Sequence, residues 1–177
     1  FDPLERLEHR AITLHRDEAI AAWAWAIPSD EAIAAIGAFA EGKVVEMGAG
    51  KGYWAWLLEQ AGLEVHAYDH EVPPATYTRV HVGQPAVLNA YDGAWTLLLC
   101  WPPYQDPMAV DALDAFRGHR VVYIGEGDGG CTGDNTFHRR LRRGWTEVEV
   151  IDLPQWEGIH DRVRCYTRGK KTSRRKR

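Results

Sequence analysis

Apolar residues recur at helical spacing along the first forty residues of the chain. The first series continues into the segment AIAAWAWAI and predicts a helix over residues 4–25. Pro28 interrupts this series, because proline lacks the N–H that a helix interior needs. Ser29 is a typical N-cap residue, so we expect a second helix to start there and to end at Gly42.

Short apolar runs alternate with amphipathic segments from Lys43 onward. The apolar runs that predict strands are KVVEM, LEVHAYD, RVHV, TLLLCW and RVVYIGE. Helices are predicted for YWAWLLEQAG, for the segment after Asp106 and Pro107, and for NTFHRRLRR. Strands that alternate with helices are typical of a parallel sheet with helices on both faces.

The last two apolar segments have a different period. TEVEVIDL and DRVRCYT alternate apolar and charged residues, which predicts two half-exposed strands joined by the loop PQWEGIH. Together with the five earlier strands they predict an α/β three-layer sandwich. Its seven-stranded sheet is mostly parallel and ends in a C-terminal antiparallel hairpin. We expect residues 1–42 to form helices that pack on this core.

Composition and charge narrow the class of protein. The 177 residues are 45% hydrophobic, which suits one globular domain, and no run reaches the ~18 apolar residues of a membrane span. Three cysteines form no CxxC pair, which favours a reducing compartment, the cytoplasm. Seven of the 21 basic residues lie in the last ten, which leaves 14 basic against 25 acidic residues, a formal charge of −11, for residues 1–167. The basic tail, residues 169–177, is either a disordered solvated end or a grip on phosphates.

A glycine-rich turn joins the first strand to its helix. In the segment VVEMGAGKGYW, Glu46 precedes Gly48, Gly50 and Gly52. Glycines let a ligand approach the backbone, and ligands bind at the carboxyl ends of strands in open α/β sheets. Tyr53 stands where a dinucleotide-binding fingerprint needs glycine, and no Gly-Lys-Ser/Thr follows for a Walker A loop.

The spacing E-x-G-x-G-x-G resembles motif I of the class I S-adenosyl-L-methionine (SAM)-dependent methyltransferases. The resemblance covers residues 24–168 and implies a Rossmann-like fold with SAM as cofactor and S-adenosylhomocysteine (SAH) as product. It implies that residues 43–168 form the SAM-binding core, that Glu46 holds the methionine amino group, and that Asp69, at the end of the second strand, holds both ribose hydroxyls. The other cofactor-binding residues that it implies are Pro28, Met47, Gly48, Ala49, Gly50, Gly52, His70, Gly83, Gln84 and Cys100.

A Pro-Pro corner follows the fourth strand, in LLLCWPPY. A simple turn that ends the strand is one interpretation. The corner also resembles the Asn/Asp/Ser-Pro-Pro-Tyr/Phe motif of amino-methyltransferases, which implies that Pro102 and Pro103 hold a carbonyl for the target amino group and that Tyr104 stacks on the substrate. Trp101 stands where that family has a hydrogen-bonding side chain, and indole cannot accept a hydrogen bond. Either the Trp101 and Pro102 carbonyls suffice, or the acceptor is not an exocyclic amine. Alternatively, Trp101 stacks on adenine or on the substrate.

These residues favour a SAM-dependent methyltransferase that modifies an amino group of a nucleic-acid base. A small-molecule or peptide methyltransferase is the first alternative. A non-enzymatic SAM-binding module, recruited to nucleic acid by the basic tail, is the second. Glu126 and Asp128 in IGEGDGG are further candidates, either to receive a proton or bind substrate or as a solvated acidic loop. No metal is expected, because Cys131 and His138 match no zinc spacing.

Overall fold

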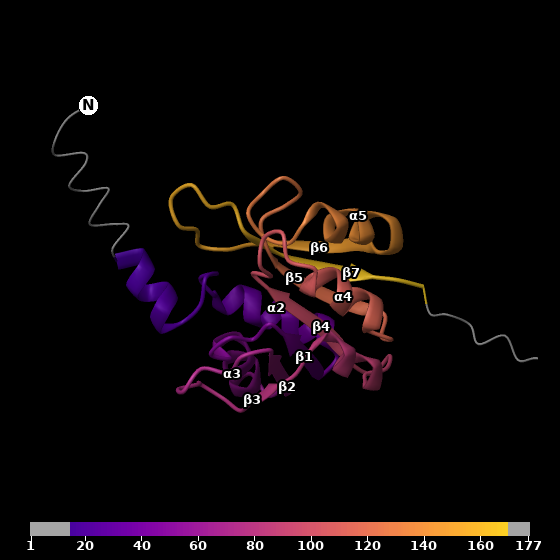
Figure 1. Cartoon of the computed structure of the whole chain (residues 1–177), viewed down its shortest axis with the longest axis horizontal. Coiled ribbons are helices and arrows are strands. Elements are labelled where there is room, and N and C mark those ends of the chain that lie inside the picture. Colours follow the sequence, from indigo (N-terminus) through magenta and orange to yellow (C-terminus); the bar gives the residue numbers. More distant parts are fainter. Residues whose placement is uncertain (1–14, 170–177) are drawn as a thin grey trace, which may run out of the picture.

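Seven strands form one mixed sheet at the centre of the protein, whose computed structural model describes residues 15–169 (Figure 1). In chain order the strands are β1 (Lys43–Met47), β2 (Glu64–Asp69), β3 (Val80–Val82), β4 (Thr96–Cys100), β5 (Arg120–Gly125), β6 (Thr146–Asp152) and β7 (Arg162–Thr167). They lie in the order β3-β2-β1-β4-β5-β7-β6. The first five strands are parallel, and β7 runs antiparallel to both β5 and β6. This confirms the predicted α/β fold with its C-terminal antiparallel hairpin.

Helices cover both faces of the sheet. The labelled helices are α2 (Asp30–Ala40), α3 (Tyr53–Gln60), α4 (Met108–Ala115), α5 (Asn135–Gly144) and the 3₁₀ helix η1 (Pro85–Ala90). The side chains of α2 and α3 share one hydrophobic cluster, and those of α4, α5 and η1 share the other. The sheet is therefore the middle of three layers.

Alternate residues of each parallel strand enter the two clusters. In β4, Leu97 and Leu99 belong to the cluster beneath α4 and α5, whereas Leu98 belongs to the one beneath α2 and α3. All three leucines are fully buried. This double burial explains why the parallel strands are continuous apolar runs.

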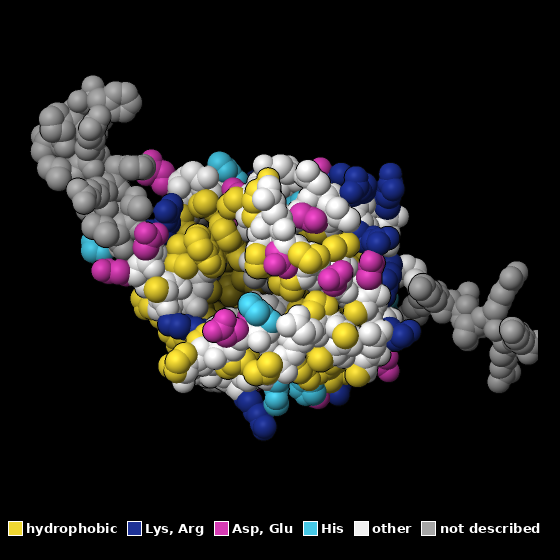
Figure 2. Space-filling view, viewed as in Figure 1, with side chains coloured by type: hydrophobic (Ala, Val, Ile, Leu, Met, Phe, Trp, Pro, Cys, Tyr) yellow, Lys and Arg dark blue, Asp and Glu magenta, His cyan; other side chains and the backbone are white. Residues whose placement is uncertain are grey.

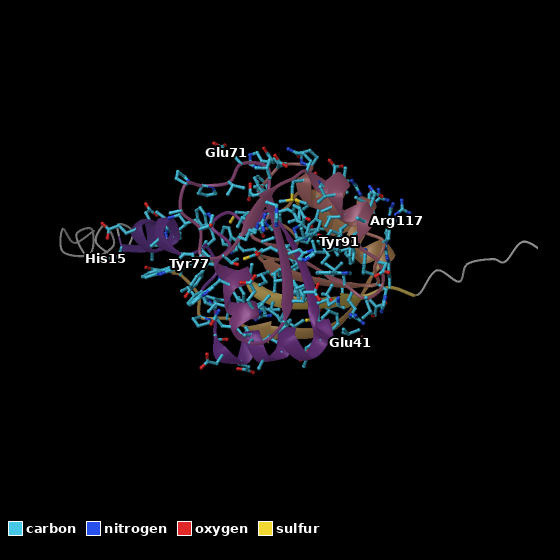
Figure 3. The ribbon with its side chains drawn as sticks, turned by 90° about the horizontal axis from the view of Figure 1, so that it is seen from below. His15, Glu41, Glu71, Tyr77, Tyr91 and Arg117 are labelled. Carbon is cyan, nitrogen blue, oxygen red and sulfur yellow. The ribbon has the colours of Figure 1, made fainter. Side chains whose placement is uncertain are left out.

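The strand order reverses between β1 and β4, which are neighbours in the sheet. Chains that leave two such strands at their carboxyl ends turn to opposite faces and open a crevice between them. In Figure 1 this edge of the sheet faces the helix of residues 15–22. Figure 3 places Tyr77 near that helix and Glu41 and Arg117 at the opposite end of the molecule.

The first helix ends earlier than predicted. Among the described residues it spans 15–22, and residues 23–29 are not helical. Ser29 is the predicted N-cap of α2, and its Oγ accepts a hydrogen bond from the Ala32 N–H at 3.2 Å. Residues 4–14 of the predicted helix and residues 170–177 of the basic tail lie outside the described residues. The division of the chain at residues 42 and 168 stays a prediction.

The hairpin strands differ from each other in burial. In β7, Val163 and Cys165 are buried as the alternation predicts. In β6, Val148 and Val150 are 53% and 41% exposed, so the same prediction is wrong there. A register shift between Glu147 and Glu149 disrupts the alternation on this edge strand. No helix among the described residues is long and apolar enough to cross a bilayer.

Candidate functional site: a cavity beside the glycine-rich turn

A cavity of about 260 Å³ lies where β1 and β4 end. Its wall combines the glycine-rich turn, the segment of residues 20–25, and Cys100 and Trp101 at the end of β4. Figure 2 shows a hollow with mainly hydrophobic side chains on the side of the molecule nearest this segment. The structure thus brings the predicted motif I and the first residue of the predicted corner into one site.

The glycine-rich turn has a backbone that suits a close approach by a ligand. Gly48 has φ of 80°, and a Cβ there would lie 2.8 Å from the Met108 Cε. Gly50 has φ of 53° and would place a Cβ in open space. The N–H groups of Gly48 and Ala49 both donate to the Tyr68 carbonyl, at 2.9 and 3.0 Å. Positive φ at these positions favours glycine, and the bond to β2 fixes the turn at the cavity wall.

Glu46 is buried in this wall, and its Oε2 accepts no hydrogen bond from the part of the chain that the structure describes. Burial raises its pKa to about 8, although the Ala55 backbone N–H opposes the shift, and the charge of Asp69 adds to it. Trp54, also in the wall, has a buried Nε1 without an acceptor among the same residues. Two residues of the wall therefore carry a buried polar atom without a partner, an acceptor on Glu46 and a donor on Trp54.

Asp69 fixes the turn from the end of β2. Its Oδ2 accepts the Gly50 N–H at 2.7 Å, and its Oδ1 accepts the Glu71 N–H at 3.1 Å. The exposed His70 places its Nδ1 2.9 Å from the same Oδ1. The side chain of Asp69 is not in the cavity wall, so the structure shows it holding the glycine-rich turn.

The other residues expected at the cofactor are divided. Cys100 is in the wall, and burial raises its pKa well above the ordinary value. Those outside the wall are Pro28, Met47, Gly52, His70, Gly83 and Gln84. Met47 belongs to the hydrophobic core. Gly52 and Gln84 are the N-cap residues of α3 and η1, and the Gly83 N–H donates to the Asp69 carbonyl at 2.8 Å.

Trp101 turns the chain sharply after β4. It has φ of 49°, an uncommon conformation for a residue with a side chain. Its ring stacks on Trp25, with ring centroids 4.7 Å apart and planes 14° from parallel. Its Nε1 donates a hydrogen bond of 2.9 Å to Asp161 Oδ2. The Trp101 ring is thus held by stacking on one face and by a hydrogen bond at its N–H edge.

The rest of the predicted corner does not join this cavity. The Pro102 carbonyl accepts the Gly133 N–H at 2.9 Å, so it is already engaged within the protein. Pro103 is exposed, and Tyr104 is 56% exposed. Tyr104 lines a separate cavity of about 630 Å³ with Glu126 and Asp128. Tyr104 therefore does not line the cavity beside the glycine-rich turn, and its stacking on a substrate stays a prediction.

Glu126 is held by the protein's own backbone in that second cavity. Its Oε2 accepts the Cys131 N–H at 2.8 Å and its Oε1 the His160 N–H at 3.0 Å. Burial raises its pKa, but these hydrogen bonds and nearby His160 outweigh burial and leave the pKa lowered. Glu126 is therefore a buried, bonded carboxylate, and the interpretation of a solvated acidic loop is wrong for it.

Asp161, like the wall residues Trp25 and Trp54, was not assigned to the site from the sequence. It is 1% exposed, and burial raises its pKa although the Trp101 N–H opposes the shift. It precedes β7 directly and belongs to no motif, so no signal in the sequence marked it. Within residues 15–169 no group of three or more His, Cys, Asp or Glu side chains is placed to hold a metal ion.

No protein-family model and no curated protein matches the sequence. Solved structures do match. A TehB-like SAM-dependent methyltransferase from Corynebacterium glutamicum has a TM-score of 0.57 at 18% identity, over 92% of this chain and 99% of the other. The 1,6-didemethyltoxoflavin-N1-methyltransferase of Burkholderia thailandensis has a TM-score of 0.55 at 19% identity, over 91% and 89%. The magnesium protoporphyrin IX methyltransferase of Synechocystis has a TM-score of 0.52 at 14% identity, over 96% and 86%. At these identities the likeness shows a shared fold.

Proposed function

We propose that this chain is a SAM-dependent methyltransferase and that the cavity beside Glu46 holds the amino-acid end of the cofactor. The unused acceptor on Glu46 and the unused donor on Trp54 carry this proposal. When bound, SAM supplies a methyl group on a positively charged sulfur. Its ammonium group would donate to Glu46 Oε2, and its carboxylate would accept from Trp54 Nε1.

Three further observations support the cofactor proposal. The cavity lies at the reversal of strand order, where open α/β sheets bind ligands. Gly50 leaves open space beside its backbone. Two proteins of the same fold were solved with SAM or SAH bound. In this proposal Asp69 keeps its bonds to the turn and uses its remaining lone pairs for the ribose hydroxyls.

For the methyl acceptor we propose a small molecule. Glu126 lines the open cavity beside Tyr104, and its carboxylate would repel a phosphodiester backbone, whereas Asp128 in the same cavity is paired with Arg142. One of the two acceptor positions of the Pro102 carbonyl is taken by the Gly133 N–H, which weakens the case for the base-binding arrangement of amino-methyltransferases. The neighbour from Burkholderia thailandensis was solved with a small molecule, 1,6-didemethyltoxoflavin.

A nucleic-acid base is the second candidate acceptor, because basic residues gather at one end of the molecule. Figure 2 shows Lys and Arg side chains over α5, away from the hollow. The arginines of α5 are Arg139, Arg140, Arg142 and Arg143. Arg140 and Arg142 already pair with Asp114 and Asp128, which lowers their value for phosphate binding.

Titration calorimetry with SAM and SAH tests the cofactor site. We expect both to bind, and Glu46→Gln to weaken binding by about 10- to 100-fold through loss of a charge-assisted hydrogen bond. Glu126→Gln is the matched control, because it changes another buried glutamate at the same sheet edge whose oxygens are already bonded. Equal affinities in the wild type and in Glu46→Gln would contradict the site.

Incubation with methyl-labelled SAM separates the two acceptors. We expect label in a small-molecule extract and none in RNA or DNA. Label in nucleic acid, lost when residues 169–177 are deleted, would instead support the second candidate.

A further inference from the structure

The Trp25–Trp101 stack occupies space inside the proposed cofactor cavity. Both rings line its wall, and their faces are in contact at a centroid distance of 4.7 Å. A third ring between them would need ~7 Å, about two stacking distances. Trp25 lies in the non-helical segment after residue 22 and is 47% exposed, so it can leave Trp101 without disturbing the core.

Asp161 presents an unused acceptor beside this stack. Its Oδ2 accepts the Trp101 indole N–H, whereas its Oδ1 accepts nothing from the chain between residues 15 and 169. A buried carboxylate oxygen without a donor is costly, which points to a donor that a ligand brings. The Gln155 side chain donates to the Asp161 carbonyl at 2.9 Å and fixes the backbone at this point.

One loop holds both tryptophans of the stack. Between β6 and β7, Trp156 Nε1 donates to the Trp25 carbonyl at 3.0 Å, and Asp161 holds Trp101. The backbone of Trp25 is therefore anchored on one side while its ring covers Trp101. Rotation of the Trp25 side chain would uncover the face of the Trp101 ring, whose indole N–H edge is bonded to Asp161.

We propose that the methyl acceptor is a planar ring with an N–H group, that it replaces Trp25 on the face of Trp101, and that it donates its N–H to Asp161 Oδ1. This inference rests on the proposed methyltransferase function. Asp161 then supplies, from a distant loop, the hydrogen-bond acceptor that an amino-methyltransferase motif carries at position 101. Asp161 and Trp101 are in this account the residues that determine acceptor specificity.

The test uses two quinazolines that differ at the exocyclic nitrogen, which carries two N–H groups in one and two methyl groups in the other. The full chain is saturated with SAH, and 4-aminoquinazoline and 4-(dimethylamino)quinazoline are titrated by calorimetry. We expect the wild type to bind the amino compound about tenfold more tightly. In Asp161→Asn the carboxamide oxygen must accept from Trp101, which turns its NH₂ toward the ligand, so the preference should vanish or reverse.

A second pair of variants tests the role of Trp25. Trp25→Ala removes the competing ring and should tighten binding of both probes several-fold. Trp56→Ala is the control, because Trp56 is a half-buried tryptophan of α3 that lies outside the cavity wall and stacks on Tyr53, not on Trp101. It should leave probe affinity near the wild-type value.

Several results would overturn the inference. These are equal affinity of the wild type for both probes, no probe binding to either the wild type or Trp25→Ala, a preference retained in Asp161→Asn, or tightening by Trp56→Ala as large as by Trp25→Ala. A separate titration with SAH distinguishes failure of the acceptor inference from failure of the proposed function. If SAH binds and the probes behave in any of these ways, the acceptor inference fails alone, whereas absence of SAH binding removes the proposed function itself.

Discussion

Glu46, near the end of β1, and Glu126, directly after β5, are acidic side chains buried at the same edge of one sheet. They are 1% and 9% exposed. Both oxygens of Glu126 accept backbone N–H groups, and its pKa is lowered. One oxygen of Glu46 has no donor among the described residues, and its pKa is raised to about 8. Two glutamates that are buried to a similar extent thus have pKa values shifted in opposite directions.

The two sites show that the supply of hydrogen-bond donors decides whether a buried carboxylate stabilises the fold or destabilises it. At Glu126 the chain provides the donors, and the carboxylate stabilises the loop between β5 and α5. At Glu46 the chain leaves a donor missing, so its ionised form destabilises the folded protein until a cation arrives. We interpret the first as structural and the second as ready for a ligand.

The largest expected effect is on the pH dependence of stability at Glu46. Because its pKa rises from the ordinary 4.5 to about 8 on folding, the folded protein binds more protons than the unfolded chain between these values. Wild-type stability should therefore fall as the pH rises through this window. Glu46→Gln should gain stability relative to the wild type, on the order of a few kcal/mol at pH 9 and little at pH 4. Urea unfolding at both pH values measures this, and a gain independent of pH would contradict the assignment.

A smaller effect of the opposite sign is expected at Glu126. Its lowered pKa contributes stability above the unfolded pKa, and this contribution is lost as the pH falls through the folded pKa. Glu126→Gln should cost about 1–3 kcal/mol at pH 7, because the amide NH₂ faces a backbone N–H, and less in acid. Asp128→Asn, in the same cavity but half-exposed, is the control and should change unfolding much less. If both variants unfold alike, Glu126 does not hold the loop.

Local sequence patterns predicted most of the fold and the part of the site that surrounds the end of β1. The five apolar runs, the hairpin and the Ser29 N-cap depend on neighbouring residues, so they could be predicted from the sequence. Glu46 and the glycine-rich turn line one cavity because they follow one another around the end of a single strand. Their proximity could therefore also be predicted from neighbouring residues.

Long-range contacts account for what could not be predicted. The segment AIAAWAWAI has a helical pattern, yet side chains from distant loops hydrogen-bond its carbonyls: Lys51 to Ala21, Tyr77 to Ala22 and Trp156 to Trp25. These bonds hold the segment across the cavity, and the helix ends at residue 22.

The contact between Trp101 and Asp161 likewise joins residues 60 positions apart. Periodicity carries no information about such a pair.

The most direct test of the central claim counts the protons released when SAH binds. At pH 7 the free protein holds a proton on Glu46, and an ammonium group at its Oε2 would drive that proton off. Calorimetric titrations at pH 7 in buffers of different ionisation enthalpy should show close to one proton released by the wild type and almost none by Glu46→Gln. Tight binding of SAH to the wild type without proton release would contradict the claim that Glu46 receives the cofactor's amino group.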